Sequence, residues 1–357
     1  MKQLIHISAS NIHGLGASQL VESLLPALAA VGSARLGTVF VPETGPLADM
    51  STNLGLVTVK VVRHVPKAMS RVTECLFSRH YYPINGNILV LGDLPLAIAG
   101  KQVVLVHRTH MVSGADTGSI SGNAKVAVSR WLFHRNAKHI HRAIVQSDVI
   151  GNKLRDNFPE LRKRICVLPQ PAPQWLAAVA PVERSGTKWD GSRELRLLYP
   201  ASAYPHKNHD LLHRYARDFG GRREAHILLT LDAVDSDWSD MLKPIGLQGP
   251  DGMRDQYRLA DALLFPSLDE SYGLPLVEAM TIGLPILVAN RPYAHSLCGD
   301  TAIYFDPADI ASLDGAIGLL RQRLITGWVP DYSARLSLIP HSWNEVAQRM
   351  FALFDSD

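Results

Sequence analysis

Two carboxylates flank a glycine- and proline-containing segment in the second half of the chain. Glu270 and Glu278 are eight positions apart, with Gly273 and Pro275 between them. The apolar run 262–265 predicts a buried strand before this segment, and the residues after Gly273 predict a helix that carries Glu278. A carboxylate offers acceptor oxygens to a vicinal diol, and ligands of open α/β sheets bind where the strands end. The segment therefore predicts a sugar-nucleotide site; the alternative is that both glutamates are solvated surface charges.

A lysine follows a second apolar run, 195–199, and precedes a predicted helix. Lys207 and His206 lie in a loop that also contains Ser202. An ammonium group at this place can neutralise a diphosphate, and the amides at the start of a helix favour an anion as well. The loop therefore predicts a phosphate contact, although a single loop lysine is often only solvated.

Two glycines follow the first predicted strand, 3–8. Gly14 and Gly16 can cradle a phosphate or let an acceptor approach the backbone, or they can serve only the tight turn. A nicotinamide fingerprint is not supported, because Gln19 stands where a third glycine is needed. No acidic residue closes the second strand at the expected distance either.

Two histidines follow the apolar run 102–106. His107 comes directly after the predicted strand and His110 lies three residues further on. A histidine at the end of a strand can exchange a proton or a hydrogen bond with a ligand, or it can be a satisfied structural residue. His107 is the stronger candidate, and His110 is the second.

Strand-like and helix-like segments alternate along the chain, which predicts α/β domains with parallel sheets. The first series of strands is expected at 3–8, 36–41, 57–62, 87–91, 102–106, 142–146 and 164–169, and the second at 195–199, 226–231, 262–265, 285–289 and 302–305. Between the two series, residues 171–193 are polar and rich in turn formers, which predicts a linker. The expected domains are 1–170 and 194–340, each Rossmann-like.

Composition excludes several classes of protein. With 46% hydrophobic and 19% charged residues the chain is globular, and a net charge of +3 is too small for a dedicated nucleic-acid binder. The three cysteines are far apart, so neither a disulfide framework nor a zinc site is indicated, and a reducing cytoplasm is expected. No signal peptide or membrane-spanning run is evident, so we expect a soluble or peripheral protein.

Aromatic and basic residues mix in the segment 129–142, around Trp131, Leu132 and Phe133. This segment can rest on an anionic membrane that carries a lipid-linked acceptor. Alternatively, the three apolar side chains pack inward beneath a solvated basic face.

Taken together, these motifs resemble the family 4 glycosyltransferases of the GT-B fold. The resemblance covers essentially the whole chain and is strongest at 195–310. It implies two Rossmann-like domains with parallel sheets facing a central cleft, and a last helix, 341–357, that crosses back to the first domain. A residue matching Glu278 then binds the ribose hydroxyls of the donor, and one matching Glu270 faces the donor sugar.

The resemblance also assigns roles to the other motifs. Lys207 is expected on the donor diphosphate, and the backbone N–H groups of Tyr272, Gly273 and Leu274 on sugar hydroxyls or phosphate. The loop with Gly14 and Gly16 is expected over the donor phosphates. His107 is expected near the reacting carbon and His110 near the acceptor. Two positions depart from the family pattern: Ser202 replaces an arginine that shares the pyrophosphate, and Ser296 replaces a glutamate.

The implied activity is retaining transfer of a hexosyl unit from a nucleoside diphosphate sugar to an acceptor hydroxyl. A mannosyl unit from GDP-mannose is the first expectation, in bacterial polysaccharide or lipopolysaccharide assembly on the cytoplasmic side. No metal or cofactor is expected. A non-catalytic sugar-nucleotide-binding subunit and a GT-B epimerase or phosphorylase remain alternatives.

Overall fold

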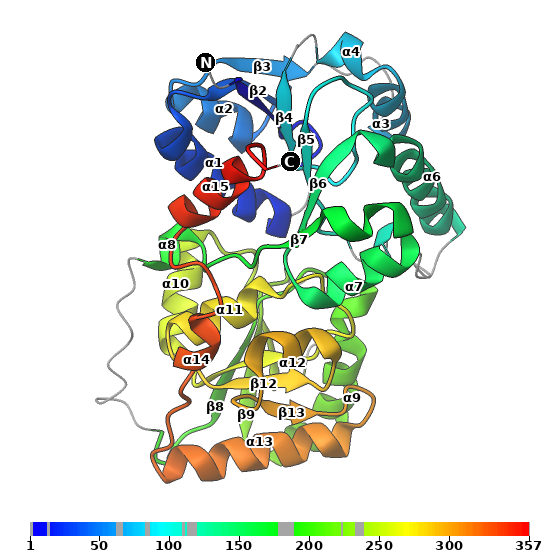
Figure 1. Cartoon of the computed structure of the whole chain (residues 1–357). Helices are drawn as coiled ribbons and strands as arrows, with labels where there is room; N and C mark the ends of the chain where they lie inside the picture. Colours follow the sequence, from blue (N-terminus) through cyan, green and yellow to red (C-terminus); the bar gives the residue numbers. More distant parts are fainter. Residues whose placement is uncertain are drawn as a thin grey trace. The chain divides into compact units, whose positions relative to one another are not determined.

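The computed structural model describes residues 3–12, 15–61, 67–82, 86–108, 111–112, 120–177, 189–222, 224–232 and 239–356. The chain divides into two compact units (Figure 1). The first unit contains Met1–Pro171 together with Ile339–Asp357, and the second contains Ala172–Leu338. The first part of the expected linker, at 174–177, is a short helix of the second unit, and residues 178–188 lie outside the described residues.

The first unit is built on a parallel sheet of seven strands in the order β3-β2-β1-β4-β5-β6-β7. Its strands are β1 (Ile5–Ser8), β2 (Leu36–Pro42), β3 (Thr58–Val61), β4 (Asn87–Val90), β5 (Gln102–Leu105), β6 (Ile140–Val145) and β7 (Ile165–Val167). From β1 the chain adds β2 and β3 on one side, and then β4 to β7 on the other side of β1. The switch point of this sheet therefore lies between β1 and β4, which pair in register from Ile5 with Asn87 to Ser8 with Val90.

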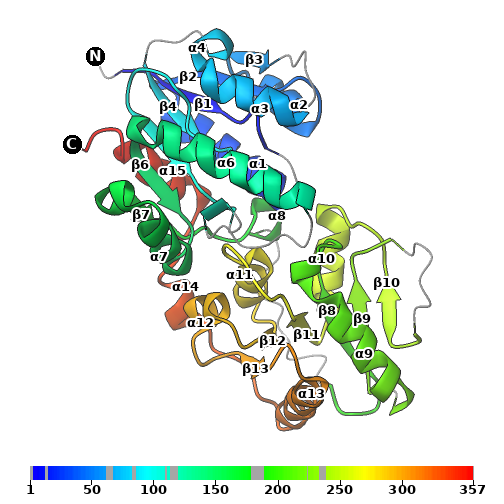
Figure 2. The ribbon, with the colours of Figure 1, turned by 90° about the vertical axis from the view of Figure 1, so that its right-hand side faces the viewer.

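Helices cover both faces of this sheet (Figure 2). They are α1 (Leu15–Gly32), α2 (Pro46–Asn53), α3 (Lys67–Leu76), α4 (Ser78–Tyr81), α6 (Ile120–Asn136), α7 (Asp148–Asn157) and α15 (Trp343–Ala352), with 3₁₀ turns at Ala137–His139 and Pro159–Arg164. Strand side chains alternate between two cores: Leu89 faces one cluster, while Ile88 and Val90 face the other. Burial on both faces explains why the central strands β4 and β5 are apolar after their first residue.

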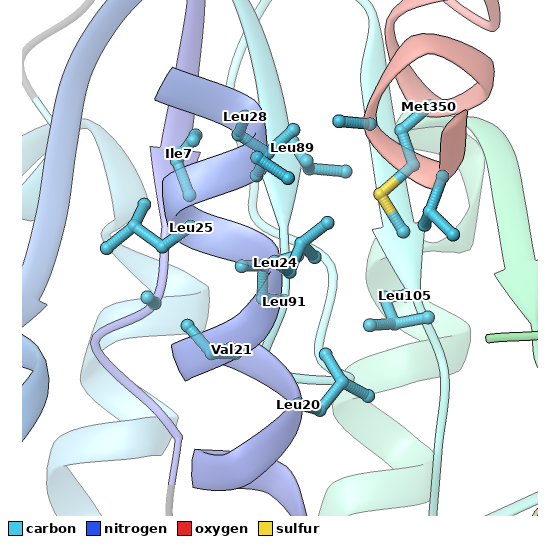
Figure 3. Close-up of a cluster of buried hydrophobic side chains, with 14 of the residues drawn as sticks. Ile7, Leu20, Val21, Leu24, Leu25, Leu28, Leu89, Leu91, Leu105 and Met350 are labelled. Atoms are coloured by element: carbon cyan, nitrogen blue, oxygen red, sulfur yellow. The ribbon is translucent and has the colours of Figure 1, made fainter. Parts of the chain in front are cut away.

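The last helix, α15, belongs to the first unit. It packs beside α1, and Met350 meets the leucines of α1 and the sheet in one cluster (Figure 3). The close approach of α15 to the end of α1 favours a glycine at position 32, because a Cβ atom on Gly32 would lie 2.4 Å from the ring of Phe351. Lys101 also donates to the carbonyl of Phe354 at 2.9 Å, so the end of the chain is attached to the sheet.

The second unit has a parallel sheet of six strands in the order β10-β9-β8-β11-β12-β13. Its strands are β8 (Leu195–Tyr199), β9 (Ala225–Leu229), β10 (Leu242–Pro244), β11 (Ala262–Phe265), β12 (Ile286–Ala289) and β13 (Ile303–Phe305). The order reverses between β8 and β11, so the two loops that leave these strands flank the switch point. The prediction of two parallel α/β domains is confirmed.

The helices of the second unit are α8 (Gln174–Ala177), α9 (His209–Phe219), α10 (Pro250–Leu259), α11 (Leu274–Thr281), α12 (Pro292–Cys298), α13 (Ile310–Ile325) and α14 (Ser333–Leu336). Two 3₁₀ turns, Pro205–Lys207 and Gly220–Arg222, flank α9. Among the helices that the structure describes, none is long and apolar enough to cross a membrane.

Candidate active site

The loop that follows β8 is held against the loop that follows β11. Asn208 has a left-handed backbone (φ 58), and its side-chain amide donates to the carbonyl of Pro266 at 3.3 Å and to that of Pro307 at 2.9 Å. The N–H of Leu268 donates to the carbonyl of His206 at 2.7 Å. These contacts place both loops at the switch point of the sheet, where the sequence predicted the ligand site.

Lys207 and Glu270 meet at this point. The ammonium nitrogen Nζ lies 2.5 Å from Oε1 of Glu270 and 5.4 Å from the centroid of the Phe265 ring. Their side chains are 14% and 12% exposed, so both charges are largely desolvated and each depends on the other. The hydroxyl of Tyr199 donates to the carbonyl of Lys207 at 2.6 Å and fixes the backbone that carries the ammonium group. Two residues that are 63 positions apart in sequence therefore form one charged pair.

Glu278 lies on α11 and is almost fully buried, at 3% exposure. The hydroxyl of Tyr257, from α10, donates to its Oε2 atom at 2.5 Å. Burial, followed by the charge of Glu278, raises the pKa of Tyr257 well above its usual range, so this hydroxyl stays protonated. The ring of Trp175 stacks on Tyr257 with centroids 6.4 Å apart. The sequence analysis missed Tyr257, which precedes β11 on an amphipathic helix and has no local sequence signal of its own.

Gly273 begins the helix that carries Glu278. Its φ of 97° is in the left-handed region, and a Cβ atom would lie 3.1 Å from Cδ1 of Leu276. Only glycine fits this conformation without strain. Tyr272, before it, is buried, and Leu274 is the first residue of α11, so the amides of this turn lie at the carboxyl edge of β11. Their contact with sugar or phosphate stays a prediction.

Ser202 lies in the same loop as Lys207, and its carbonyl accepts a hydrogen bond from the N–H of Tyr204 at 2.8 Å. The imidazole of His206 stacks on the ring of Tyr204, with an angle of 10° between the planes. Neither contact places a second positive charge beside Lys207, where the family pattern has an arginine.

In the first unit, His107 follows β5 and lies beside a buried carboxylate. Its Nε2 atom is 3.3 Å from Oδ2 of Asp93, and its side chain is 14% exposed. Burial lowers the pKa of His107 and is the largest effect, while the charge of Asp93 acts in the opposite direction. Gly16 lies in the first turn of α1, and no heavy atom would meet a Cβ atom there within 4 Å. Gly14 and His110 lie outside the described residues.

A second buried carboxylate at the switch point of the first unit had no signal in the sequence analysis. Glu74, from α3, accepts a hydrogen bond from Oγ of Ser10 at 2.8 Å and another from the hydroxyl of Tyr82. Ser8 and Ser10 also contact the Tyr82 hydroxyl, at 2.9 and 2.7 Å. This network fixes the loop after β1 in place, because each buried polar group has partners.

In the aromatic and basic segment on α6, two of the three apolar side chains pack inward and the third is exposed. Leu132 and Phe133 are buried in the core, as the inward-packing alternative expected. Trp131 is 52% exposed, with the guanidinium of Arg135 5.9 Å from its ring centroid. Contact with a membrane stays a prediction.

Comparison with known proteins identifies part of the chain. Residues 237–321 match the family model of the glycosyl transferases group 1, a range that contains Tyr257, Glu270, Gly273 and Glu278. The O-antigen chain mannosyltransferase RfbU of Salmonella typhimurium is 27% identical over 142 residues, which are 36% of this chain and 39% of the relative. The D-inositol 3-phosphate glycosyltransferase of Nocardia farcinica is 24% identical over 68% of this chain and 57% of its own length. The chain thus spans less than two thirds of these relatives.

Solved structures share the fold over nearly the whole chain. A glycosyltransferase from Rickettsia africae has a TM-score of 0.68 at 12% identity, covering 99% of this chain and 98% of its own. The Anabaena protein HepE, solved in complex with UDP-glucose, has a TM-score of 0.61 at 14% identity, again covering 99% and 98%. The chain therefore has the GT-B architecture of these neighbours and carries a glycosyl transferases group 1 domain in its second unit.

Proposed function

We propose that the chain is a retaining hexosyltransferase. It moves a hexosyl unit, with mannosyl as the first choice, from a nucleoside diphosphate sugar to an acceptor hydroxyl in polysaccharide or lipopolysaccharide biosynthesis. The observation that carries this proposal is the pairing of Lys207 with Glu270 at the sheet's switch point, in the unit that also holds Glu278. The similarity to a mannosyltransferase supports the sugar, and the shared fold with a protein solved in complex with UDP-glucose supports the donor class.

The residues divide the work of the reaction between them. Glu278 accepts hydrogen bonds from the ribose hydroxyls, and Glu270 accepts them from the donor sugar. Lys207 stabilises the negative charge that develops on the leaving diphosphate. The acceptor oxygen bonds to the anomeric carbon on the face that the diphosphate leaves, and its proton passes to the leaving phosphate oxygen. Attack and departure on one face retain the configuration.

The first unit is proposed to bind the acceptor and to contribute further contacts to the donor. His107 and the glycine loop at Gly14 and Gly16 are assigned to the reacting sugar and the donor phosphates, and His110 to the acceptor. The acceptor is a glycan or a lipid-linked sugar presented on the cytoplasmic side of the membrane. Metal ions have no role in the proposal, because Lys207 and the loop amides provide the charge stabilisation; activity is expected to persist in excess chelator.

A transfer assay with Lys207→Ala tests the proposal. Release of nucleoside diphosphate is measured from GDP-mannose, UDP-glucose, UDP-galactose and UDP-N-acetylglucosamine with mannosyl, glucosyl and galactosyl acceptor glycosides. Losing the ammonium group is expected to lower kcat by about a hundredfold, as the loss of one oxyanion donor does. Lys243→Ala is the matched control, because Lys243 is on the edge strand β10 and pairs only loosely with Asp240, at 3.7 Å. Parental turnover in Lys207→Ala would show that the site is assigned wrongly.

One observation supports a second candidate. Ser202 leaves the diphosphate with one cation fewer than the family pattern provides, which favours a sugar-nucleotide-binding subunit without turnover. Tight donor binding with no transfer to any acceptor would identify this second function.

A further inference from the structure

Asp93 lies three residues beyond β4, at the switch point of the first unit's sheet. It is 1% exposed, and its φ of 67° is one of two positive values among non-glycine residues in the described part of the chain. Its Oδ1 atom accepts the backbone N–H of His107 at 2.7 Å and that of Arg108 at 3.1 Å. A buried carboxylate in a strained backbone conformation persists only where its surroundings hold it.

The other oxygen of Asp93 faces two side chains. Oδ2 lies 3.1 Å from Nε of Arg108 and 3.3 Å from Nε2 of His107, as charge contacts without hydrogen-bond geometry, so a lone pair on Nε2 would face the carboxylate. Because a carboxylate accepts and cannot donate, the imidazole proton of a neutral His107 belongs on Nε2. The Nδ1 atom is then an acceptor, and it is buried without a hydrogen-bond partner among the described residues. A buried acceptor left open in this way lacks one hydrogen bond, which the hydroxyl of a ligand can supply.

The charges around His107 favour its neutral form. Arg71, from α3, and Arg108, on the same loop, both oppose a proton on the ring, as burial does, and Asp93 alone favours one. The loop itself is tightly packed: a Cβ atom on Gly92 would lie 2.8 Å from Cβ of Asn11, in the loop after β1. The backbone next to Asp93 is therefore packed closely against the loop after β1.

We propose that Asp93 is a positioning residue that keeps the proton of His107 on Nε2, so that Nδ1 accepts a hydrogen bond from a substrate hydroxyl. This inference rests on the proposed function for its substrate, a hydroxylated sugar. Its structural part, the choice of tautomer by Asp93, stands without it.

Asp93→Asn tests this role with little change in shape. The amide oxygen of asparagine can still accept the N–H groups of His107 and Arg108, while its NH₂ group faces the imidazole. Because an NH₂ group donates, Nε2 must become the acceptor and the proton must move to Nδ1. Nitrogen-15 NMR of the histidine-labelled protein reports which ring nitrogen carries the proton. We expect the proton on Nε2 in the parent and on Nδ1 in the variant, together with a fall in kcat of about tenfold or more.

Asp261→Asn is the matched control in the second unit. Asp261 is also a buried carboxylate that accepts the backbone N–H of Arg196 at 2.8 Å and pairs with Arg193 at 2.7 Å, so these contacts of the described residues involve arginines and not a histidine. This variant is expected to lower the thermal midpoint and to leave both the His107 tautomer and kcat unchanged.

Two results would overturn the inference. One is a parental protein with the His107 proton on Nδ1. The other is an Asp93→Asn variant in which the tautomer changes while kcat stays at the parental value. If the parent transfers no sugar from any donor, the proposed function fails, and the NMR comparison still decides whether Asp93 sets the tautomer.

Discussion

At the scale of single residues, three side chains that are assigned to the reaction each have a partner within their own unit. Lys207 is held by Glu270, Glu278 by Tyr257, and His107 by Asp93. Buried charges without partners are costly, so the partners of Lys207 and Glu278 are what allow these two groups to lie in largely desolvated places. The partners are therefore expected to influence ligand binding even where they do not touch the ligand.

Tyr257→Phe tests this expectation for Glu278. The substitution keeps the ring that stacks on Trp175 and removes only the hydrogen bond to the carboxylate, so Glu278 loses one constraint on its orientation. A hydrogen bond to a charged group contributes about 1.5 kcal/mol, so the KM for the donor sugar is expected to rise by about tenfold with little change in kcat. Steady-state kinetics with varied donor measures this.

Tyr215→Phe provides the comparison for this prediction. Tyr215, on α9, also donates its hydroxyl to a carboxylate, Asp314 of α13, at 3.1 Å, but away from the switch point. Equal donor KM values for the two tyrosine variants would contradict a role of Tyr257 in donor binding.

At the scale of elements, a histidine at the start of α9 makes the free energy of unfolding depend on pH. His209 is the first residue of this helix, and burial, then the neighbouring charges of His213 and Lys207, lower its pKa from 6.5 to about 4. The unfolded chain takes up a proton near pH 6.5, whereas the folded chain does so only near pH 4. The free energy of unfolding is therefore expected to be constant above pH 6.5 with respect to this group and to fall as the pH decreases toward 4.

Urea denaturation at several pH values checks this prediction. In His209→Asn the side chain no longer titrates, so the midpoint is expected to decrease less between neutral and acidic pH than in the parent. An equal decrease of the urea midpoint with pH in the two proteins would show that His209 has an ordinary pKa.

The elements and their order could be predicted from the sequence because both sheets are parallel and buried on both faces. The runs 102–106 and 262–265 appear as β5 and β11 within a residue of their expected bounds. The loops after β8 and β11 meet because of the same regularity, since parallel strands end at one edge.

The partners of the charged groups could not be predicted in this way. Tyr257 contacts Glu278 within the second unit, and Asp93 and Glu74 make their contacts within the first, in each case through packing between different elements. Asp93 also adopts a positive φ, which is uncommon among non-glycine residues and has no signal in the pattern of apolar residues. Nothing in the local pattern of apolar residues indicates these contacts.

At the scale of the whole molecule, the end of the chain completes the core of the first unit. Trp343 on α15 is buried in the same cluster as Ile7 and Leu24. Trp343→Ala is expected to lower the free energy of unfolding of this unit by about 3 to 5 kcal/mol, because a large buried ring is lost. Hydrogen exchange followed by mass spectrometry should show loss of protection in β1 and β4 and unchanged protection in β8 and β11.

Trp131→Ala is the control for this prediction, since the Trp131 side chain is more than half exposed on α6. It should change protection little in either unit. Loss of protection in β8 and β11 on substitution of Trp343 would show that the two units do not unfold separately.

The central claim is that the second unit binds a nucleoside diphosphate sugar through Glu278 and Lys207, and titration calorimetry tests it most directly. The parent is titrated with GDP-mannose, UDP-glucose, UDP-galactose and UDP-N-acetylglucosamine, and the best ligand is then titrated into Glu278→Ala, Lys207→Ala and the control Lys243→Ala. We expect saturable binding of at least one donor, with Kd raised about tenfold or more in the first two variants and unchanged in the control. A parent that binds none of these donors, or a Glu278→Ala protein that binds as tightly as the parent, would contradict the account.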